Sequence, residues 1–363
     1  MIGSEYSEEN EVTYMEQDEI YDENMSEYRR RTLQHVNDAD FLPYMSMTEL
    51  YDTVYTAKKC IIENLLYAGT YILAGAPKIG KSFLAAQLAY HVSNGLPIWG
   101  RAVYEGTVLY LALEDPFQRL QDRLYRMFGA DNSEKLKLAI WCHPLGGGLE
   151  KQLKGFVQEY PDTQLIIVDV LQKVRSDGGD TYSYARDYEA VTAFKQMADD
   201  WNICILLIHH TRKMNSNDKF EMISGTNGIQ GAADGALVLY TDERISANAV
   251  LDVIGRDQPS QRLLLSRNPK RLIWELEKEE GEIYRVPAEP ELEAIAGFIT
   301  KEHPHWEGTP SELLEELKIE ESANSFFKKL NCRAGRLYLD YQIRYERRRT
   351  REKRYITLDY EQS

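Results

Sequence analysis

The residues best suited to chemistry lie at positions 75–82, where Gly75-Ala76-Pro77-Lys78-Ile79-Gly80-Lys81-Ser82 fits the P-loop pattern G-x-x-x-x-G-K-S. Its glycines lack a Cβ atom, so the backbone can curl around a phosphate and point N–H groups inward. Lys81 places a positive charge on the β- and γ-phosphates, and the Ser82 hydroxyl can bind Mg²⁺. The motif predicts a nucleoside triphosphate site with ATP and Mg²⁺ as cofactors. The predicted binding residues are Gly75, Ala76, Pro77, Lys78, Ile79, Gly80, Lys81, Ser82 and Phe83.

The segments around this motif have the order that it requires. Residues 70–74 are a short apolar run typical of a buried strand, and residues 83–89 favour a helix. A strand, a glycine-rich loop and a helix form the P-loop arrangement, in which the positive end of the helix dipole faces the phosphates. A chance match in an ordinary glycine turn is the alternative, and it does not account for this context.

Two carboxylates follow apolar runs further along the chain. Asp169 follows residues 165–168, and a carboxylate at the carboxyl end of such a strand lies beside the P-loop and can hold hydrated Mg²⁺. Glu114 follows residues 109–113 and can polarise the water that phosphoryl transfer requires. The alternatives are a helix cap for Asp169 and a loop carboxylate for Glu114, and Asp115 can share the role of Glu114.

Two further kinds of residue are candidates for contact with the γ-phosphate. His209 and His210 end the apolar run 203–208, and either can hydrogen-bond to the phosphate or simply pack locally. A zinc site is a poor alternative, because no Cys or carboxylate stands at ligand spacing. Arg256 ends a late strand and can reach the γ-phosphate of a neighbouring subunit as an arginine finger, with a surface ion pair as the alternative.

Basic residues predict a second function, the binding of DNA. Residues 344–354 hold seven Lys and Arg, and such a basic wing neutralises phosphates with a steep dependence on salt. The helix expected at 321–333 is a candidate recognition helix. The polar loops 175–186 and 214–231 are long enough to be functional. For the wing, the alternative is a run of charged residues that is simply exposed to solvent. The predicted DNA contacts are Lys213, Lys219, Lys328, Lys329, Arg333, Arg344, Arg347, Arg348, Arg349 and Arg351.

The elements that must position these residues divide the chain into three parts. Residues 46–285 alternate apolar strands with amphipathic helices, which predicts an α/β domain with a mostly parallel central sheet. Residues 288–363 are predicted to form a small winged-helix domain, with helices at 291–302, 311–317 and 321–333 and then a hairpin. The start signal of the second helix is Thr309-Pro310-Ser311-Glu312. Residues 1–45 are acidic, and we expect them to be largely disordered. In the large domain we expect strands at 70–74, 107–113, 136–141, 165–168, 203–208, 235–240, 249–254, 262–266 and 272–275, the last four antiparallel, and a helix at 188–200.

Composition separates the two ends of the chain and limits the class of protein. The formal net charge of the 363 residues is −15, but residues 1–28 hold ten acidic residues and no Lys or Arg. Residues 323–358 instead hold eleven Lys and Arg against three acidic residues. The sequence shows no membrane span and no secretory signal, so we expect a cytoplasmic protein. Its four cysteines, Cys60, Cys142, Cys204 and Cys332, lie far apart and suit a reducing compartment.

Residues 50–275 resemble the RecA-like ATPases of the RepA type, a family of hexameric replicative helicases and related ATPases of plasmids, phages and integrated elements. The resemblance implies that Glu114 is the catalytic base and that His210, rather than His209, senses the γ-phosphate. It also implies a ring, with a hexamer as one possible size, with ATP between subunits and Arg256 acting in trans. Many relatives have Gly where this chain has Lys78. The resemblance rests on residues 75–82, Tyr110–Asp115, Ile166–Asp169, Ile208–Lys213 and Ser224–Asp234.

These features support two hypotheses of different classes. The first is an ATP-driven DNA helicase or translocase in the replication of a mobile element, with replication proteins as possible partners. The second is an ATP-switched DNA-binding regulator or helicase loader that does not unwind DNA, which the appended basic domain favours. Filament-forming recombination is a third hypothesis, and closed rings would count against it.

Overall fold

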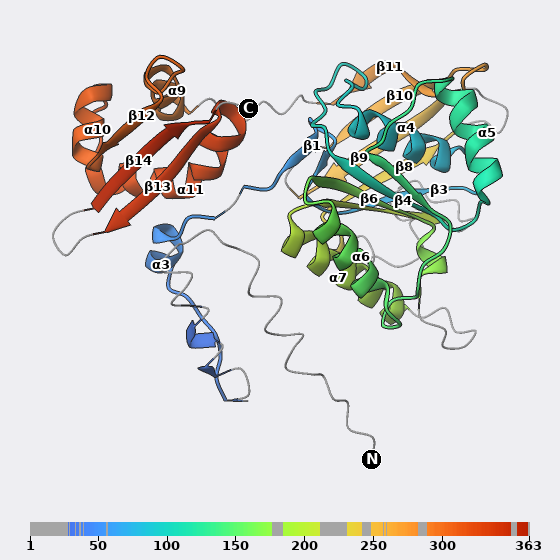
Figure 1. The fold of residues 1–363 in the computed structure, drawn as a ribbon, viewed down its shortest axis with the longest axis horizontal. Coiled ribbons are helices and arrows are strands. Elements are labelled where there is room, and N and C mark those ends of the chain that lie inside the picture. The colour runs from blue at the N-terminus through green and yellow to red at the C-terminus, as the bar shows by residue number, and fades with distance from the viewer. Residues whose placement is uncertain are drawn as a thin grey trace. The chain divides into compact units, whose positions relative to one another are not determined.

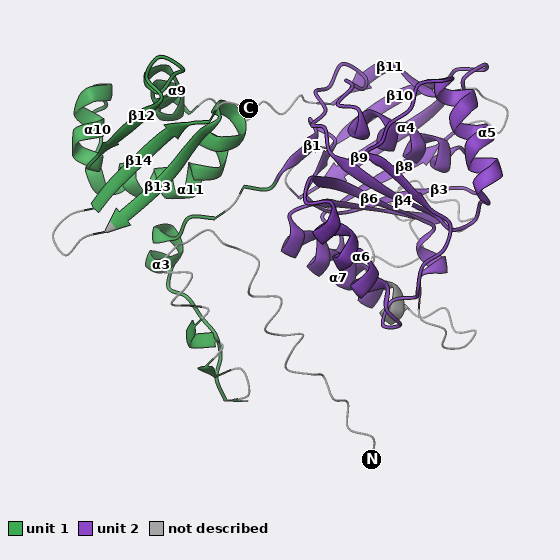
Figure 2. Cartoon of the chain, in the orientation of Figure 1, with its two compact units in different colours: residues 1–58, 286–363 green, residues 59–285 purple. Residues whose placement is uncertain are grey.

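The chain folds into two compact units (Figure 2). The computed structural model describes residues 40–55, 57–175, 184–210, 231–241, 248–256, 258, 260–281, 289–349 and 354–361, with isolated positions between 28 and 38. Lys59–Arg285 form the large unit, and Met1–Lys58 together with Val286–Ser363 form the small unit. Residues 46–58, which the sequence pattern placed with the large domain, therefore fall in the small unit.

The large unit is built on a nine-stranded sheet, which confirms the predicted α/β class (Figure 1). The strand order is β11-β10-β9-β8-β3-β7-β6-β4-β5, with parallel pairing from β8 to β5 and antiparallel pairing from β8 to β11. The antiparallel end was expected from the absence of long helices between the late strands. The strands are β3 (Gly69–Gly75), β4 (Thr107–Ala112), β5 (Leu136–Ala139), β6 (Thr163–Asp169), β7 (Cys204–His210), β8 (Gly235–Tyr240), β9 (Asn248–Gly255), β10 (Gln261–Arg267) and β11 (Trp274–Glu280), and a separate hairpin joins β1 (Cys60–Ile62) to β2 (Leu66–Tyr67).

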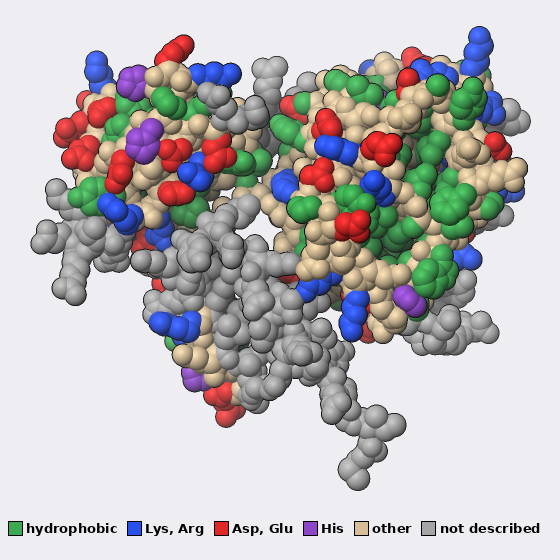
Figure 3. Space-filling model, viewed as in Figure 1, with side chains coloured by type: hydrophobic (Ala, Val, Ile, Leu, Met, Phe, Trp, Pro, Cys, Tyr) green, Lys and Arg blue, Asp and Glu red, His purple; other side chains and the backbone are tan. Residues whose placement is uncertain are grey.

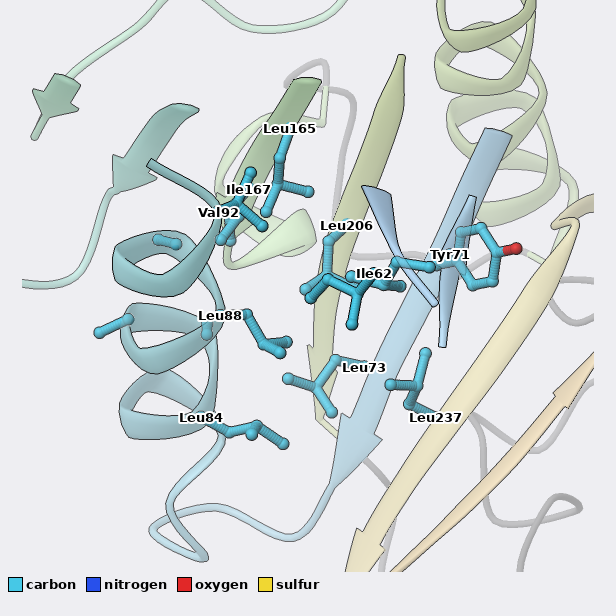
Figure 4. Packing of buried hydrophobic residues seen from close by; sticks show 14 of the residues in the cluster. Ile62, Tyr71, Leu73, Leu84, Leu88, Val92, Leu165, Ile167, Leu206 and Leu237 are labelled. Carbon is cyan, nitrogen blue, oxygen red and sulfur yellow. The ribbon is translucent and has the colours of Figure 1, made fainter. Parts of the chain in front are cut away.

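Helices cover both faces of this sheet (Figure 1). One face packs against α4 (Lys81–Ser93) and α5 (Phe117–Phe128), and the other against α6 (Leu149–Glu159) and α7 (Tyr184–Trp201). A short 3₁₀ turn, η1 (Leu171–Lys173), follows β6. In the first layer, Leu84 and Leu88 of α4 point toward Leu73, Ile167 and Leu206 of the strands (Figure 4). Because the central strands are buried on both faces, their sequences are continuous apolar runs.

The direction of each strand decides which residues can meet. Gly75 at the end of β3 lies level with His210 at the end of β7, and Ala112 at the end of β4 lies level with Asp169 at the end of β6. The P-loop, His210 and Asp169 thus share the carboxyl edge of the sheet. Strand β9 is antiparallel to β8, and β10 is antiparallel to β9, so β10 again runs toward the carboxyl edge.

The small unit consists of helices packed against a three-stranded antiparallel sheet of order β12-β14-β13. Helix α10 begins at a capping box, in which Thr309 accepts from the backbone N–H of Glu312, as the sequence predicted. The sequence pattern missed the short strand β12 and ended the last helix near residue 333 instead of Tyr341. The elements are α3 (Met47–Asp52), α9 (Pro290–Phe298), β12 (His305–Gly308), α10 (Pro310–Leu317), α11 (Ala323–Tyr341), β13 (Ile343–Arg349) and β14 (Arg354–Tyr360).

Residues 46–58, which we call the strap, lie along α11 within the small unit. The Asn331 side chain donates to the Tyr51 carbonyl at 3.2 Å, and Val54 packs against the apolar core of the unit. At Gly335 an added Cβ would stand 2.3 Å from the Cβ of Ala57, so the strap passes where α11 has no side chain. The chain segment before the large unit is therefore part of the small unit.

Among the described residues, no helix combines the length and the apolar composition that a bilayer span needs.

Candidate functional site

The P-loop is held in place by two close approaches that glycine alone permits. A Cβ on Gly75 would stand 2.4 Å from the Leu239 carbonyl oxygen on β8. Gly80 has φ 111°, and a Cβ there would stand 2.8 Å from Cζ2 of Trp274. Both glycines of the motif are thus fixed by packing as well as by the needs of a phosphate.

Lys81 converges with three acceptors at the carboxyl edge of the sheet. Its Nζ donates to the Gly75 and Ala76 carbonyls at 2.8 and 3.0 Å, and it lies 3.0 Å from Nδ1 of His210. The side chain is buried, and burial lowers the pKa of Lys81 to about 8, although Asp169 and Glu114 oppose this shift. An ammonium group in these surroundings lacks a full counter-charge, which a triphosphate would supply.

Asp169, the candidate magnesium ligand, lies beside two hydroxyl groups. The buried Tyr110 hydroxyl donates to Oδ2 of Asp169 at 2.8 Å, and the Ser82 hydroxyl is close enough to lower the pKa of this carboxylate. Burial raises the pKa of Asp169, and the two hydroxyl groups oppose that shift by stabilising the anion. The sequence analysis missed Tyr110; the available signal was a hydroxyl inside an otherwise apolar strand, which must find a partner when buried.

The two carboxylates after β4 have different surroundings. Asp115 forms ion pairs with Arg119, at 3.1 Å, and with Arg123 on α5. Glu114 is exposed and close enough to Lys81 to influence its pKa. The ion pairs hold Asp115 against α5, so the exposed Glu114 is the stronger candidate for the general base.

The two histidines that end β7 also separate. His209 is buried and lies 3.1 Å from the side-chain nitrogen of Gln172, whereas His210 faces Lys81. Burial and the charge of Lys81 lower the pKa of His210, which favours a neutral ring whose Nδ1 accepts from the lysine. Alternation along the strand sends the two side chains to opposite faces, so they do not have equivalent access to the phosphate.

Arg256 lies at the opposite edge of the sheet from its own P-loop. It follows β9, and Gly255 there pairs with Gly235, which in turn pairs with Tyr71 near the start of β3. The Arg256 side chain donates to the Gly231 carbonyl at 2.8 Å. Tyr71 and Gly75 are separated by about 13 Å of strand. Arg256 is therefore remote from the phosphate edge of its own chain.

Lys78 occupies the exposed turn of the P-loop with a positive φ of 67°. This left-handed conformation costs a residue with a Cβ about 1–2 kcal/mol, whereas glycine adopts it readily. Glycine at this position would avoid that cost, which Lys78 carries in this chain.

Four of the ten basic residues expected to contact DNA are paired with carboxylates within the small unit. On α11, Lys329 bonds to Glu291 at 2.6 Å, and Arg333 bonds to Glu289 at 2.8 Å. On the hairpin, Arg344 lies 3.5 Å from Asp359, and Arg348 lies 3.4 Å from Glu307. Figure 3 shows acidic side chains among the basic ones over the small unit. Such exposed ion pairs contribute about 0–1 kcal/mol, so an incoming phosphate can replace them.

Other predicted contacts lie beside the strap, near the hairpin tip or outside the described residues. Lys328 stands over the Tyr51 ring at 6.0 Å, which places it beside the strap. Arg347 is half-buried on β13, and Arg349 ends this strand. Lys213, Lys219 and Arg351, with most of both polar loops, lie outside the described residues.

The donor set fits a magnesium nucleotide. Helix α4 has no side-chain cap at Gly80, so its first N–H groups face the P-loop without a side-chain acceptor. Within the described residues, no group of three or more His, Cys, Asp or Glu is arranged to hold a metal ion. A metal brought by the nucleotide, with Ser82 and Asp169 as protein contacts, agrees with this arrangement.

Comparisons with known proteins agree with this fold. Residues 40–216, just under half of the chain, match the model of a family described as an AAA domain. A solved structure of an ATPase domain is similar at 13% identity and a TM-score of 0.50, covering 70% of this chain and 99% of that chain. No curated protein matches. At this identity, the likeness shows a RecA-like fold and nothing finer.

Two other solved structures are similar at lower scores. A DnaB-like replicative helicase, described with its interactions with primase, is 13% identical at a TM-score of 0.48 and covers 69% of this chain and 66% of that chain. A KaiC-like protein from Pyrococcus horikoshii OT3 is 13% identical at a TM-score of 0.44 and covers 61% of this chain and 99% of that chain. The assignment of a RecA-like fold to the large unit is supported by the first structure and by the order and direction of its own strands.

Proposed function

We propose that this chain is an ATP-hydrolysing motor that acts on DNA, as a helicase or translocase. The observation that carries the proposal is the convergence of Lys81, Asp169, Glu114 and His210 at the carboxyl edge of a RecA-like sheet. These groups come from four different strand ends or loops and provide the positive charge, metal ligand, base and hydrogen-bonding group that phosphoryl transfer requires.

Each residue has one role in the proposed reaction. Lys81 exchanges its carbonyl partners for phosphate oxygens and compensates their negative charge. Glu114 orients the attacking water and accepts its proton, while Tyr110 holds the carboxylate of Asp169 in position. His210 loses its contact with Lys81 when the lysine turns to the phosphates. Bound Mg²⁺ neutralises charge on the phosphate oxygens and is held by Ser82 and Asp169.

Assembly and DNA contact complete the proposal. Because Arg256 lies at the far edge of its own sheet, it can act on ATP only in a neighbouring subunit, which supports a ring, with a hexamer as the expected size. The order of helices and strands in the small unit supports a winged helix whose hairpin tip contacts DNA phosphates. Replication of a mobile element, with replication proteins as partners, is the setting that the sequence resemblance favours.

The second candidate function is an ATP-switched DNA-binding regulator or loader that does not unwind. The basic hairpin of the small unit favours it, because positive charge concentrated outside the ATPase unit can bind DNA without unwinding it. Strand displacement and ATPase activity at fixed salt distinguish the two. DNA-stimulated hydrolysis without displacement would support the regulator and reject the helicase.

Two variants test the two halves of the proposal separately. Lys81→Ala should reduce ATP turnover by at least about 100-fold, because it removes the charge that holds the phosphates. A chain ending after residue 287 should bind DNA more weakly and with a smaller salt slope, because it lacks the basic hairpin. Unchanged turnover in the first variant would refute the nucleotide site, and unchanged DNA binding in the second would refute the wing.

A further inference from the structure

A second arginine of the late strands, unlike Arg256, reaches the phosphate edge of the sheet. Strand β10 runs toward that edge and ends at Arg267, next to Ser266, which pairs with Asn248. Asn248 lies two residues before Val250, the partner of Tyr240 at the carboxyl end of β8. The strand directions therefore place Arg267 at the same edge as Gly75.

Aromatic side chains then hold Arg267 against the P-loop. Its guanidinium carbon lies 4.4 Å from the centre of the Phe83 ring and 5.7 Å from that of Trp274. Phe83 follows Ser82 directly on α4, and the Trp274 indole nitrogen lies 3.4 Å from the Gly80 carbonyl, to which it donates. Arg267 thus packs on the two rings that flank the phosphate cradle.

Within the described part of the chain, no carboxylate is paired with Arg267, and its buried Nε atom has no hydrogen-bond partner. Burial and the nearby Arg126 lower its pKa, so the protein itself disfavours this charge. Two other arginines near it are paired with carboxylates. Arg262 on the same strand bonds to Asp252 at 2.7 and 3.0 Å, and Arg123, which also lies over the Phe83 ring, is paired with Asp115.

We propose that Arg267 is a nucleotide-binding residue that neutralises the α-phosphate of the bound nucleotide. This inference rests on the proposed ATP site. An arginine stacked on aromatic rings keeps the N–H edge of its planar group available for an anion. In a P-loop, Lys81 and Ser82 act at the β- and γ-phosphates. Phe83 is one residue further along α4, so a cation beside its ring is placed to contact the remaining phosphate, the α-phosphate.

This position has a distinct functional consequence. The α-phosphate is common to ATP and ADP and is not transferred in the reaction. A contact made there binds substrate and product alike, and it does not become stronger in the transition state. Arg267 should therefore set nucleotide affinity, whereas Glu114 and His210 act where the γ-phosphate is cleaved.

The test measures ATP and ADP binding by calorimetry, together with kcat and KM, on the full chain. Arg267→Met keeps an apolar stem against Phe83 and Trp274 but has no charge, and Arg267→Ala removes both. In the Met variant we expect Kd for both nucleotides to rise by about 10- to 100-fold, the range for a charged hydrogen bond, with kcat within about twofold of the parent. Arg267→Lys should restore part of the affinity, and the control Arg262→Ala should bind as the parent chain does.

Each other outcome overturns the assignment in a different way. Parent-like affinity in Arg267→Met, while Lys81→Ala loses binding, would reject Arg267 and leave the ATP site standing. A loss confined to ATP would place Arg267 at the γ-phosphate and reject the α-phosphate. A parent chain that binds neither nucleotide would overturn the proposed function itself, and the role of Arg267 with it.

Discussion

The affinity for nucleotide should fall as the pH rises, because the surroundings of Lys81 lower the pKa of this lysine. Burial lowers the pKa of Lys81 from 10.5 to about 8 in the nucleotide-free chain. A bound triphosphate restores a counter-charge and raises that pKa again. The lysine is charged and ready to bind below pH 8, and it must take up a proton before it can bind above pH 8. Affinity is therefore high at pH 7 and is lost as the pH rises through 8.

The size of the effect follows from the size of the shift. With a pKa of about 8, the ammonium form makes up most of the protein at pH 7 and about 3% of it at pH 9.5. If the lysine stays charged in the complex, the observed affinity falls by about 30-fold between these two values, approaching tenfold per pH unit. The shift from 10.5 corresponds to about 3 kcal/mol of lost ammonium stabilisation, which contact with the phosphates would offset.

Titration calorimetry with a non-hydrolysable ATP analogue checks this reasoning between pH 7 and 9.5. Buffers of different ionisation enthalpy report proton uptake directly, and circular dichroism confirms that the chain stays folded. Lys81→Arg is the matched control, because a guanidinium keeps its charge throughout this range; its affinity should change little with pH. Equal affinity at pH 7 and 9.5 in the parent chain, with no proton uptake, would refute the perturbed lysine.

Three other substitutions test the site and the strap. Glu114→Gln should keep nucleotide binding but slow hydrolysis by about 10²–10⁴-fold, the range for a lost general base; a parent-like rate would move that role elsewhere. Tyr110→Phe should raise the Mg²⁺ concentration for half-maximal turnover by about tenfold, because Asp169 loses an orienting donor; an unchanged Mg²⁺ titration of turnover would contradict this. Gly335→Ala should expose the strap to limited proteolysis and lower the thermal midpoint of unfolding, because the added Cβ meets Ala57. The control Gly297→Ala has open space around it and should raise the midpoint through better helix propensity. The same result in both variants would show that the strap does not pack against Gly335.

Much of the fold was readable from the sequence, because the relevant signals are local. The continuous apolar runs at 165–168 and 235–240 identified buried strands, and the capping box at Thr309 identified the start of α10. Strand β12 escaped notice because four residues with one buried position give no period to detect. The strap escaped because its partner, α11, is almost 280 residues away in the sequence.

The sequence by itself determined the P-loop, the strands that lead to Glu114 and Asp169, and the class of the large unit. Those features depend on residue types at fixed short spacings and on a period that one strand or helix imposes. The tertiary structure alone showed that Asp115 is held in ion pairs while Glu114 is exposed, that Lys81 lies against His210, and that Tyr110 bonds to Asp169. It also separated Arg256 from Arg267, because the direction of each strand decides which edge of the sheet its last residue reaches. No local pattern holds that information.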